Sequence, residues 1–179
     1  MRERTVPHDI VLRPERPDDA DGVEALYAQV FGPGRHARMA YRLREGATRD
    51  HTVSVVAVRG GLVIGAVRQV RVLVGGAPAY LLGPLAVAET AAKQGIGGAL
   101  MHRTADAAAG TPAHGIVLVG DPEFYEPLGY RPAGDRIVMP GPVERHRVLE
   151  RTLRCELGGP LGLGPWLEER SGLQPSSPG

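Results

Sequence analysis

Residues 81–100, LLGPLAVAETAAKQGIGGAL, place an apolar stretch, a glycine turn and the start of an alanine-rich helix directly after one another. Glycines let a ligand approach the backbone closely. The free N–H groups in the first turn of a helix, together with the helix dipole, attract negative charge. The run Gly95-Ile96-Gly97-Gly98 therefore predicts a phosphate-binding turn that leads into a helix over about residues 97–109.

A dinucleotide is one ligand class that such a turn can bind. Its fingerprint needs G-x-G-x-x-G directly after the first strand of a parallel unit, with an acidic residue about 20 positions later. Here Leu100 stands where the third glycine would be, and the strand lies in the middle of the chain. A nicotinamide-dinucleotide enzyme is therefore the weaker interpretation of this turn.

Three strands are predicted in the middle of the chain, over residues 52–58, 62–72 and 79–87. Glycine pairs at positions 60–61 and 75–76 separate them, and such pairs are typical of tight hairpins. Gly83-Pro84 inside the third strand indicates a bulge or a close approach of a ligand. The three strands form an antiparallel meander, which argues against a parallel dinucleotide-binding sheet.

Helices and further strands flank this meander. Before it we expect a strand at 10–13, a helix that begins at Asp18 or Asp19 and runs to about Phe31, and a basic helix over 35–45. After the helix at 97–109 we expect a buried strand at 115–119, a short helix from Pro122, a strand at 136–139, and an edge strand or short helix at 148–153. Residues 1–155 are predicted to form a single domain. Residues 156–179 are predicted to be a Gly/Pro/Ser-rich tail with irregular backbone from Gly158.

Composition excludes several classes of protein. A length of 179 residues suits one domain with a real core, and a formal net charge of +1 gives no case for nucleic-acid binding. The apolar runs are too short for a membrane span, and the N-terminal residues lack a signal-peptide pattern, so we expect a cytoplasmic protein. A single cysteine, Cys155, and histidines without metal-ligand spacing give no reason to expect a disulfide or a metal site.

Two separate motifs resemble those of the GNAT superfamily of N-acetyltransferases, in the branch of small bacterial predicted acetyltransferases. The first is Leu85-Ala86-Val87 followed by Gly95-Ile96-Gly97, which is similar to the family's strand, Q/R-x-x-G-x-G/A turn and helix. The second is GDPEFYEPLGYRP at 120–132, where a short helix with Phe-Tyr precedes Leu-Gly-Tyr. The resemblance covers about residues 9–140, and the order of elements between the motifs agrees with it.

The resemblance implies an α/β fold. A mixed, mostly antiparallel twisted sheet would contain a central β-α-β crossover and carry helices on both faces. In this fold the two strands of the crossover start parallel and then splay apart, and acetyl-CoA lies in the gap between them.

The resemblance also implies a set of cofactor-binding residues. Backbone N–H groups of Leu85, Ala86 and Val87 would hold the pantetheine arm and the thioester carbonyl. The pyrophosphate would lie on the turn formed by Lys93, Gln94, Gly95, Ile96, Gly97 and Gly98. The chain departs from the family pattern at Ala92, where the motif has Gln or Arg, and Lys93 or Gln94 would take over part of that role.

Tyr125 is the residue that the resemblance implies as proton donor to the departing thiolate. A phenol with a pKa near 10 suits a thiolate leaving group, although the same tyrosine could be a packed aromatic beside Phe124 and Tyr130. Many members of the family place a glutamate on this strand, but residues 81–87 contain no acid. The nearest acids are Glu89, Asp121 and Glu123, and a chain of water molecules is the alternative, so the general base is left unassigned with Glu89 as a candidate. Arg35 and His36 are the candidates for binding the acceptor, because the first two helices flank the acceptor groove in this family.

The sequence thus predicts an acetyl-CoA-dependent N-acetyltransferase that acts on a primary amine of a small molecule, a peptide or a protein. Transfer would be direct, in a ternary complex and without an acyl-enzyme. The alternative is a non-catalytic acyl-CoA sensor of the same fold. We expect no metal, no nucleic-acid or membrane partner, and a monomer or homodimer. The alanine- and arginine-rich composition suggests a bacterial source.

Overall fold

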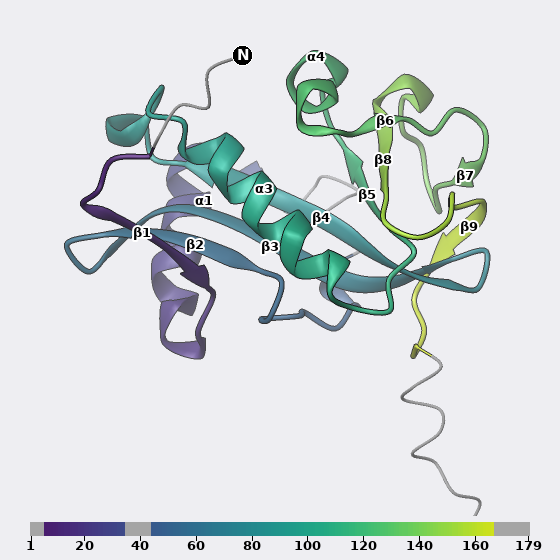
Figure 1. Cartoon of the computed structure of the whole chain (residues 1–179), viewed down its shortest axis with the longest axis horizontal. Coiled ribbons are helices and arrows are strands. Elements are labelled where there is room, and N and C mark those ends of the chain that lie inside the picture. Colours follow the sequence, from purple (N-terminus) through teal and green to yellow (C-terminus); the bar gives the residue numbers. More distant parts are fainter. Residues whose placement is uncertain (1–5, 35–43, 167–179) are drawn as a thin grey trace, which may run out of the picture.

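A computed structural model describes residues 6–34 and 44–166 of the chain (Figure 1). Its helices are α1 (Ala20–Phe31), α3 (Ile96–Ala109) and the single turn α4 (Pro122–Tyr125). Its strands are β1 (Ile10–Pro14), β2 (Val55–Arg59), β3 (Leu62–Val74), β4 (Ala77–Val87), β5 (Gly115–Val119), β6 (Arg131–Pro132), β7 (Ile137–Val138), β8 (Val148–Thr152) and β9 (Gly159–Gly162). Residues 35–43, which hold most of the basic helix predicted at 35–45, lie outside the described residues.

The predicted antiparallel meander is present as β2, β3 and β4, with β1 antiparallel to β2. Both residues of each glycine pair have positive φ, 55° and 81° at Gly60-Gly61 and 56° and 83° at Gly75-Gly76. Two consecutive residues with positive φ give the tight turn whose twist matches two paired strands. The glycine pairs therefore fix the registers of both hairpins.

The β4–α3–β5 crossover is also as predicted. Strands β4 and β5 are parallel and pair at three positions, from Ala79 opposite Gly115 to Leu81 opposite Val117. Beyond Leu81, β4 continues to Val87 without pairing to β5, which turns away with β8 as its other neighbour. A gap therefore opens between the carboxyl ends of the two central strands.

Helices cover both faces of this sheet. In Figure 1, α3 crosses the near face and α1 lies behind the sheet. Helix α1 packs on β3 and β4 through Val23, Leu26 and Tyr27, all of which are buried. Asp19 stands at the N-cap of α1 but does not cap it, because its carboxylate instead accepts hydrogen bonds from Arg13 and from the backbone N–H of Arg16.

Residues 148–152 form β8, which settles the choice left open between a strand and a helix. This strand is not an edge strand, because it lies between β5 and β6 and pairs with both. Its first three residues are buried, so the apolar pair Val148-Leu149 belongs to the core rather than to the rim of the sheet.

The segment after Gly158 differs from the sequence-based expectation. Irregular backbone was the wrong prediction for its first part, since Gly159–Gly162 forms β9 and pairs with both β3 and β7. Trp166 beyond it is buried, and its indole N–H donates to the Val72 carbonyl over 3.1 Å. Its ring packs edge-on against Tyr80, with the centroids 5.1 Å apart. The buried Trp166 and the pairings of β9 with β3 and β7 thus hold a segment whose composition is typical of disordered chain.

Candidate active site

Strand β4 bulges next to the point where it leaves β5. Val67 pairs with Leu85 and Gln69 pairs with Leu82, so Gly83 and Pro84 together face the single residue Arg68. The extra residue breaks the hydrogen-bond ladder locally and turns carbonyl groups away from the neighbouring strand. The bulge that Gly83-Pro84 predicted from sequence is therefore present, and it lies at the entrance to the gap.

Two side chains on the α1 face hold the carbonyl groups of this bulge. The Tyr27 hydroxyl donates to the Pro84 carbonyl over 2.9 Å, and Nη2 of Arg44 donates to the Leu82 carbonyl over 3.1 Å. Tyr27 is fully buried, and burial raises the pKa of its phenol, so it acts as a fixed neutral donor. The bulge is thus tied to α1 and to the segment that precedes β2.

The glycine turn has the conformation that the sequence predicts. Gly95 is the N-cap of α3 with φ 79°, a left-handed conformation that glycine adopts without steric penalty. Gly97 and Gly98 follow in the first turn of the helix. A Cβ added at Gly97 would lie 3.8 Å from Val87 and 3.9 Å from Phe124, so this turn lies beside the end of β4 and the α4 turn.

Lys93 and Gln94, the residues expected to contact the pyrophosphate, stand directly before this turn. Lys93 is exposed and has φ 62°. Gln94 is half-buried, and its Oε1 accepts a hydrogen bond of 2.7 Å from Arg59 at the end of β2. Because that oxygen already has a partner, Gln94 braces the turn against β2.

Tyr125 folds back onto the end of β5. A Cβ added at Gly120 would overlap Cε2 of Tyr125, so the ring rests directly on glycine backbone. Phe124 and Tyr130 pack against it edge-on, with centroids at 4.8 and 6.1 Å. Asp121 caps α4 by accepting from the backbone N–H of Glu123, which holds the turn that carries the tyrosine.

The electrostatic environment keeps this phenol protonated. Burial raises the pKa of Tyr125 above its ordinary value of 10.0, and the positive charges of Arg44 and Arg147 offset part of that shift. Arg44 is bonded to the β4 carbonyl of Leu82, whereas Nε of Arg147 lies 3.5 Å from the carbonyl oxygen of Gly120 at the end of β5. Two arginines anchored on opposite sides of the gap thus act on one tyrosine.

A cavity of ≈ 300 Å³ lies on the α1 face beside the bulge. Gly83 and Pro84 form one wall, and Tyr27 and Glu24 of α1 form another. The remaining lining residues come from the segment before β2 and from β3: Arg44, Glu45, Ala47, Arg49, His51, Arg68 and Val70. Arg44 therefore lines the cavity, contacts the bulge and acts electrostatically on Tyr125.

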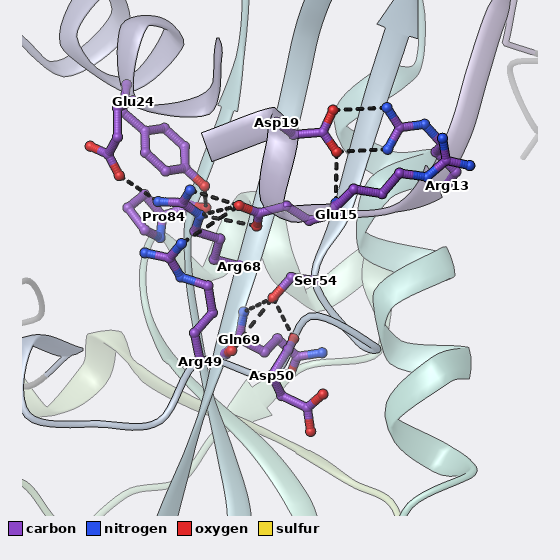
Figure 2. Close-up of polar contacts among 12 residues, drawn as sticks. Arg13, Glu15, Asp19, Glu24, Arg49, Asp50, Ser54, Arg68, Gln69 and Pro84 are labelled. Carbon is purple, nitrogen blue, oxygen red and sulfur yellow. Dashed lines mark hydrogen bonds and ion pairs between the residues drawn. The ribbon is translucent and has the colours of Figure 1, made fainter. Parts of the chain in front are cut away.

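An ion-pair network forms the floor of this cavity (Figure 2). Arg68 of β3 donates to both carboxylate oxygens of Glu15 at 2.7–3.1 Å and to Glu24 at 2.5 Å. Its guanidinium also lies 5.4 Å from the ring centroid of Tyr27. Sequence reasoning missed Glu15, Glu24 and Arg68. The only signal was that Glu24 and Tyr27 share a helix face at a spacing of three residues.

The remaining candidates are placed differently. Glu89 is exposed in a 3-10 turn at 89–91 after β4 and does not line the cavity. Arg35 and His36 lie outside the described residues. Within residues 6–34 and 44–166, no group of His, Cys, Asp or Glu is arranged to hold a metal ion. Across the same ranges, no helix has the length and hydropathy needed to cross a membrane.

Comparison with known proteins places this geometry in a family. The family model of the acetyltransferase (GNAT) domain matches residues 50–132, which include the meander, the glycine turn and the Tyr125 segment. The resemblance of these residues to a GNAT acetyltransferase domain is therefore confirmed. A comparison with curated protein sequences returned no match.

Solved structures agree with this assignment. A GNAT family N-acetyltransferase (YhbS) from Escherichia coli, in complex with CoA, is 27% identical, with a TM-score of 0.75 over 89% of this chain and 93% of that one. A GNAT family acetyltransferase from Brucella melitensis, in complex with acetyl-CoA, is 25% identical, with a TM-score of 0.68 over 88% and 97%. Arabidopsis thaliana Naa50, in complex with a bisubstrate analogue, shares the fold at 19% identity, with a TM-score of 0.58 over 80% of this chain and 99% of that one. The predicted GNAT fold is confirmed.

Proposed function

We propose that this GNAT domain transfers an acetyl group from acetyl-CoA directly to a primary amine of a small molecule or peptide. The observation that carries the proposal is the arrangement around the gap. The glycine turn at the start of α3 lies at one end of it, the bulge of β4 borders it, and the Tyr125 ring stands on the end of β5. Two structures similar to this chain were solved with CoA or acetyl-CoA.

Each part of the site has a role in this proposal. The amides at 95–98 and the positive end of α3 bind the pyrophosphate. The main chain of Leu85, Ala86 and Val87 borders the gap and holds the pantetheine arm and the thioester carbonyl. Backbone N–H groups directed at that carbonyl would stabilise the oxyanion that forms as the amine attacks. The cavity beside the bulge then brings the amine to the opposite side of the thioester.

Tyr125 completes the transfer. A nitrogen–carbon bond forms and the carbon–sulfur bond breaks, and the phenol gives its proton to the departing thiolate. The proton that the amine nitrogen loses passes to solvent water, from which the phenolate regains its proton. Because burial raises the pKa of Tyr125, the donor stays protonated through neutral and mildly alkaline pH. The rate should therefore rise with pH as the amine is deprotonated, and it should fall through loss of the donor only above about pH 10.

Replacement of Tyr125 by Phe tests this proposal and separates it from the sensor alternative. Release of the CoA thiol is measured with a panel of spermidine, free amino acids and short peptides as acceptors. Tyr125→Phe should lower kcat about 100-fold or more, and titration calorimetry should show unchanged affinity for acetyl-CoA. Tyr130→Phe is the matched control, because it removes the hydroxyl of the neighbouring buried tyrosine, for which the described residues offer no hydrogen-bond partner.

Two outcomes of that experiment are distinct. Turnover by Tyr125→Phe equal to wild type would show that the tyrosine is a packed aromatic. Binding of acetyl-CoA without turnover on any amine would favour a non-catalytic sensor, for which the absence of Gln or Arg at Ala92 is the supporting observation.

Glu89→Gln tests the candidate base. If Glu89 is the general base, the rate of acetyl transfer by this variant should be lower than that of wild type at pH values below the pKa of the amine.

The alanine- and arginine-rich composition and the bacterial neighbours in structure support a bacterial source. We propose in addition that the protein works in the cytoplasm as a monomer or homodimer.

A further inference from the structure

The cavity beside the bulge carries charges of both signs. Arg44, Arg49 and Arg68 line it together with Glu24 and Glu45. Charges of both signs in one lining can pair with an anionic group and with a cationic group of the same ligand. The charges thus favour an acceptor that itself carries both signs.

Arg68 is not available to such an acceptor. Its side chain is 6% exposed, and its guanidinium is bonded to Glu15 and Glu24. The Glu15 side chain is 1% exposed, and its carboxylate is already paired with Arg68. These two residues form a neutral floor, so the groups that can bind a ligand are those at the rim.

Arg49 is the cation at that rim. Its side chain is 37% exposed, and its Nη1 lies 3.7 Å from Oε1 of Glu15, beyond hydrogen-bond distance. Figure 2 shows its guanidinium beside Arg68 and Pro84. A planar guanidinium presents a fork of N–H groups that matches a carboxylate through two parallel hydrogen bonds. Arg49 is therefore placed to bind an anionic group of the acceptor.

Glu24 of α1 lines the same cavity as Arg49. One of its oxygens bonds to Arg68, and its side chain is 43% exposed. It lies one helical turn before Tyr27, whose hydroxyl holds the Pro84 carbonyl at the bulge. A carboxylate at this position accepts hydrogen bonds from an amino group close to the gap between β4 and β5.

The size of the cavity limits the acceptor. Its volume of ≈ 300 Å³ is at the small end of ligand pockets, which range over about 300–1,000 Å³. Resting on the proposed acetyl transfer, we infer that the acceptor is a free amino acid, whose carboxylate binds Arg49 and whose amino group binds Glu24. Its side chain would lie along Val70 and Ala47, two apolar residues of the lining.

The experiment compares carboxylate and carboxamide acceptors. CoA-thiol release is measured with each of the twenty common L-amino acids and with the corresponding amino-acid amides, which keep the amine and lose the negative charge. At least one amino acid should be acetylated with a kcat/KM about 10- to 100-fold above that of its amide, the range that one charge-assisted hydrogen-bonded pair provides.

Arg49→Gln should remove that preference. It should raise KM for the amino acid about 10- to 100-fold, with little change in kcat, and leave KM for the amide unchanged. Glu24→Gln should weaken both acceptors, because both carry the amine. Arg103→Gln is the matched control, since Arg103 is an exposed residue on α3 outside the cavity lining.

Other outcomes would overturn the inference. Amides acetylated as well as the acids, or an equal effect of Arg49→Gln on both, would show that no carboxylate binds at Arg49. Acetylation of spermidine or peptide amides but of no amino acid would remove the inference and leave the proposed acetyl transfer standing. If the protein binds no acetyl-CoA, both the proposed acetyl transfer and the inference about its acceptor are wrong.

Discussion

Glu15 and Arg68 form an ion pair that is buried almost completely, from residues 53 positions apart in the chain. The free-energy cost of removing the two charges from water is offset here by three N–H···O contacts between the side chains at 2.7–3.1 Å. Such a pair adds little to stability relative to apolar residues, but the loss of one partner leaves the other charge buried and unpaired.

We therefore predict that Glu15→Gln lowers the free energy of unfolding by about 3–5 kcal/mol. Urea denaturation of the variant and wild type measures this difference. Glu156→Gln serves as control because Glu156 is exposed, and it should stay within about 0.5 kcal/mol of wild type. Equal stability of Glu15→Gln and wild type would mean that water reaches Arg68 in solution.

Asp50 makes the stability of the folded state depend on pH in the acid range. Burial raises the pKa of this carboxyl, but hydrogen bonds from Thr52, Tyr80 and Arg71 outweigh burial and hold the pKa below its ordinary value of 3.8. A carboxyl whose pKa is lower in the folded state stabilises the protein above its unfolded pKa and loses that contribution as pH falls through the folded value.

Thermal unfolding between pH 7 and pH 2 should therefore show a loss of stability that begins near pH 4 and continues below it. Asp50→Asn should be less stable at pH 7 and should lose less on acidification, because it cannot bind the extra proton. An acid response of Asp50→Asn identical to that of wild type would assign the effect to other carboxyls, of which Asp19, paired with Arg13, is the first to test.

At the scale of elements, the glycine turn joins β4 to α3 in a conformation that only some residues tolerate. Gly95 has φ 79°, whereas Gly97 lies inside the helix, where an added methyl group would meet no atom closer than 3.8 Å. Gly95→Ala should lower stability by about 1–2 kcal/mol and weaken acetyl-CoA binding, because the amides of the turn shift. Gly97→Ala should keep the stability of wild type. Calorimetric titration with acetyl-CoA compares Gly95→Ala with wild type, and an unchanged affinity would contradict a backbone phosphate site.

The elements around this turn were predictable because their signals are local. Glycine pairs defined the two hairpins, and apolar runs followed by Gly95 and Gly110 bounded α3. The cavity was not predictable, because Glu15, Glu24, Arg49 and Arg68 come from four separate segments. Each of them taken alone has the pattern of a surface charge, and they meet only in the folded chain, through the contacts of Arg68 and of Glu15.

At the scale of the whole molecule, the C-terminal segment is part of the fold. Strand β9 pairs with β3 and β7, and the guanidinium of Arg71 lies 4.8 Å from the ring centroid of the buried Trp166. Sequence analysis missed this because Gly, Pro and Ser dominate the segment and hide a single anchoring aromatic. The domain boundary proposed at residue 155 can therefore be tested by truncation.

Trp166→Ala should lower the free energy of unfolding by about 3–5 kcal/mol, the range for loss of a buried aromatic. A chain that ends at residue 155 should lose at least as much, because it also lacks β9. Urea denaturation measures both. A truncated chain as stable as the full one would support the boundary at 155 and contradict the packing of Trp166.

The central claim is that the gap between β4 and β5 binds acetyl-CoA. The most direct measurement is a thermal shift of the full chain with acetyl-CoA, CoA and NAD side by side, each in excess. A ligand at a hundred times its dissociation constant stabilises the folded state by about 2.7 kcal/mol, which raises Tm by several degrees. We predict a rise with acetyl-CoA and CoA and none with NAD. A rise with NAD alone, or no rise with either CoA species, would contradict the account.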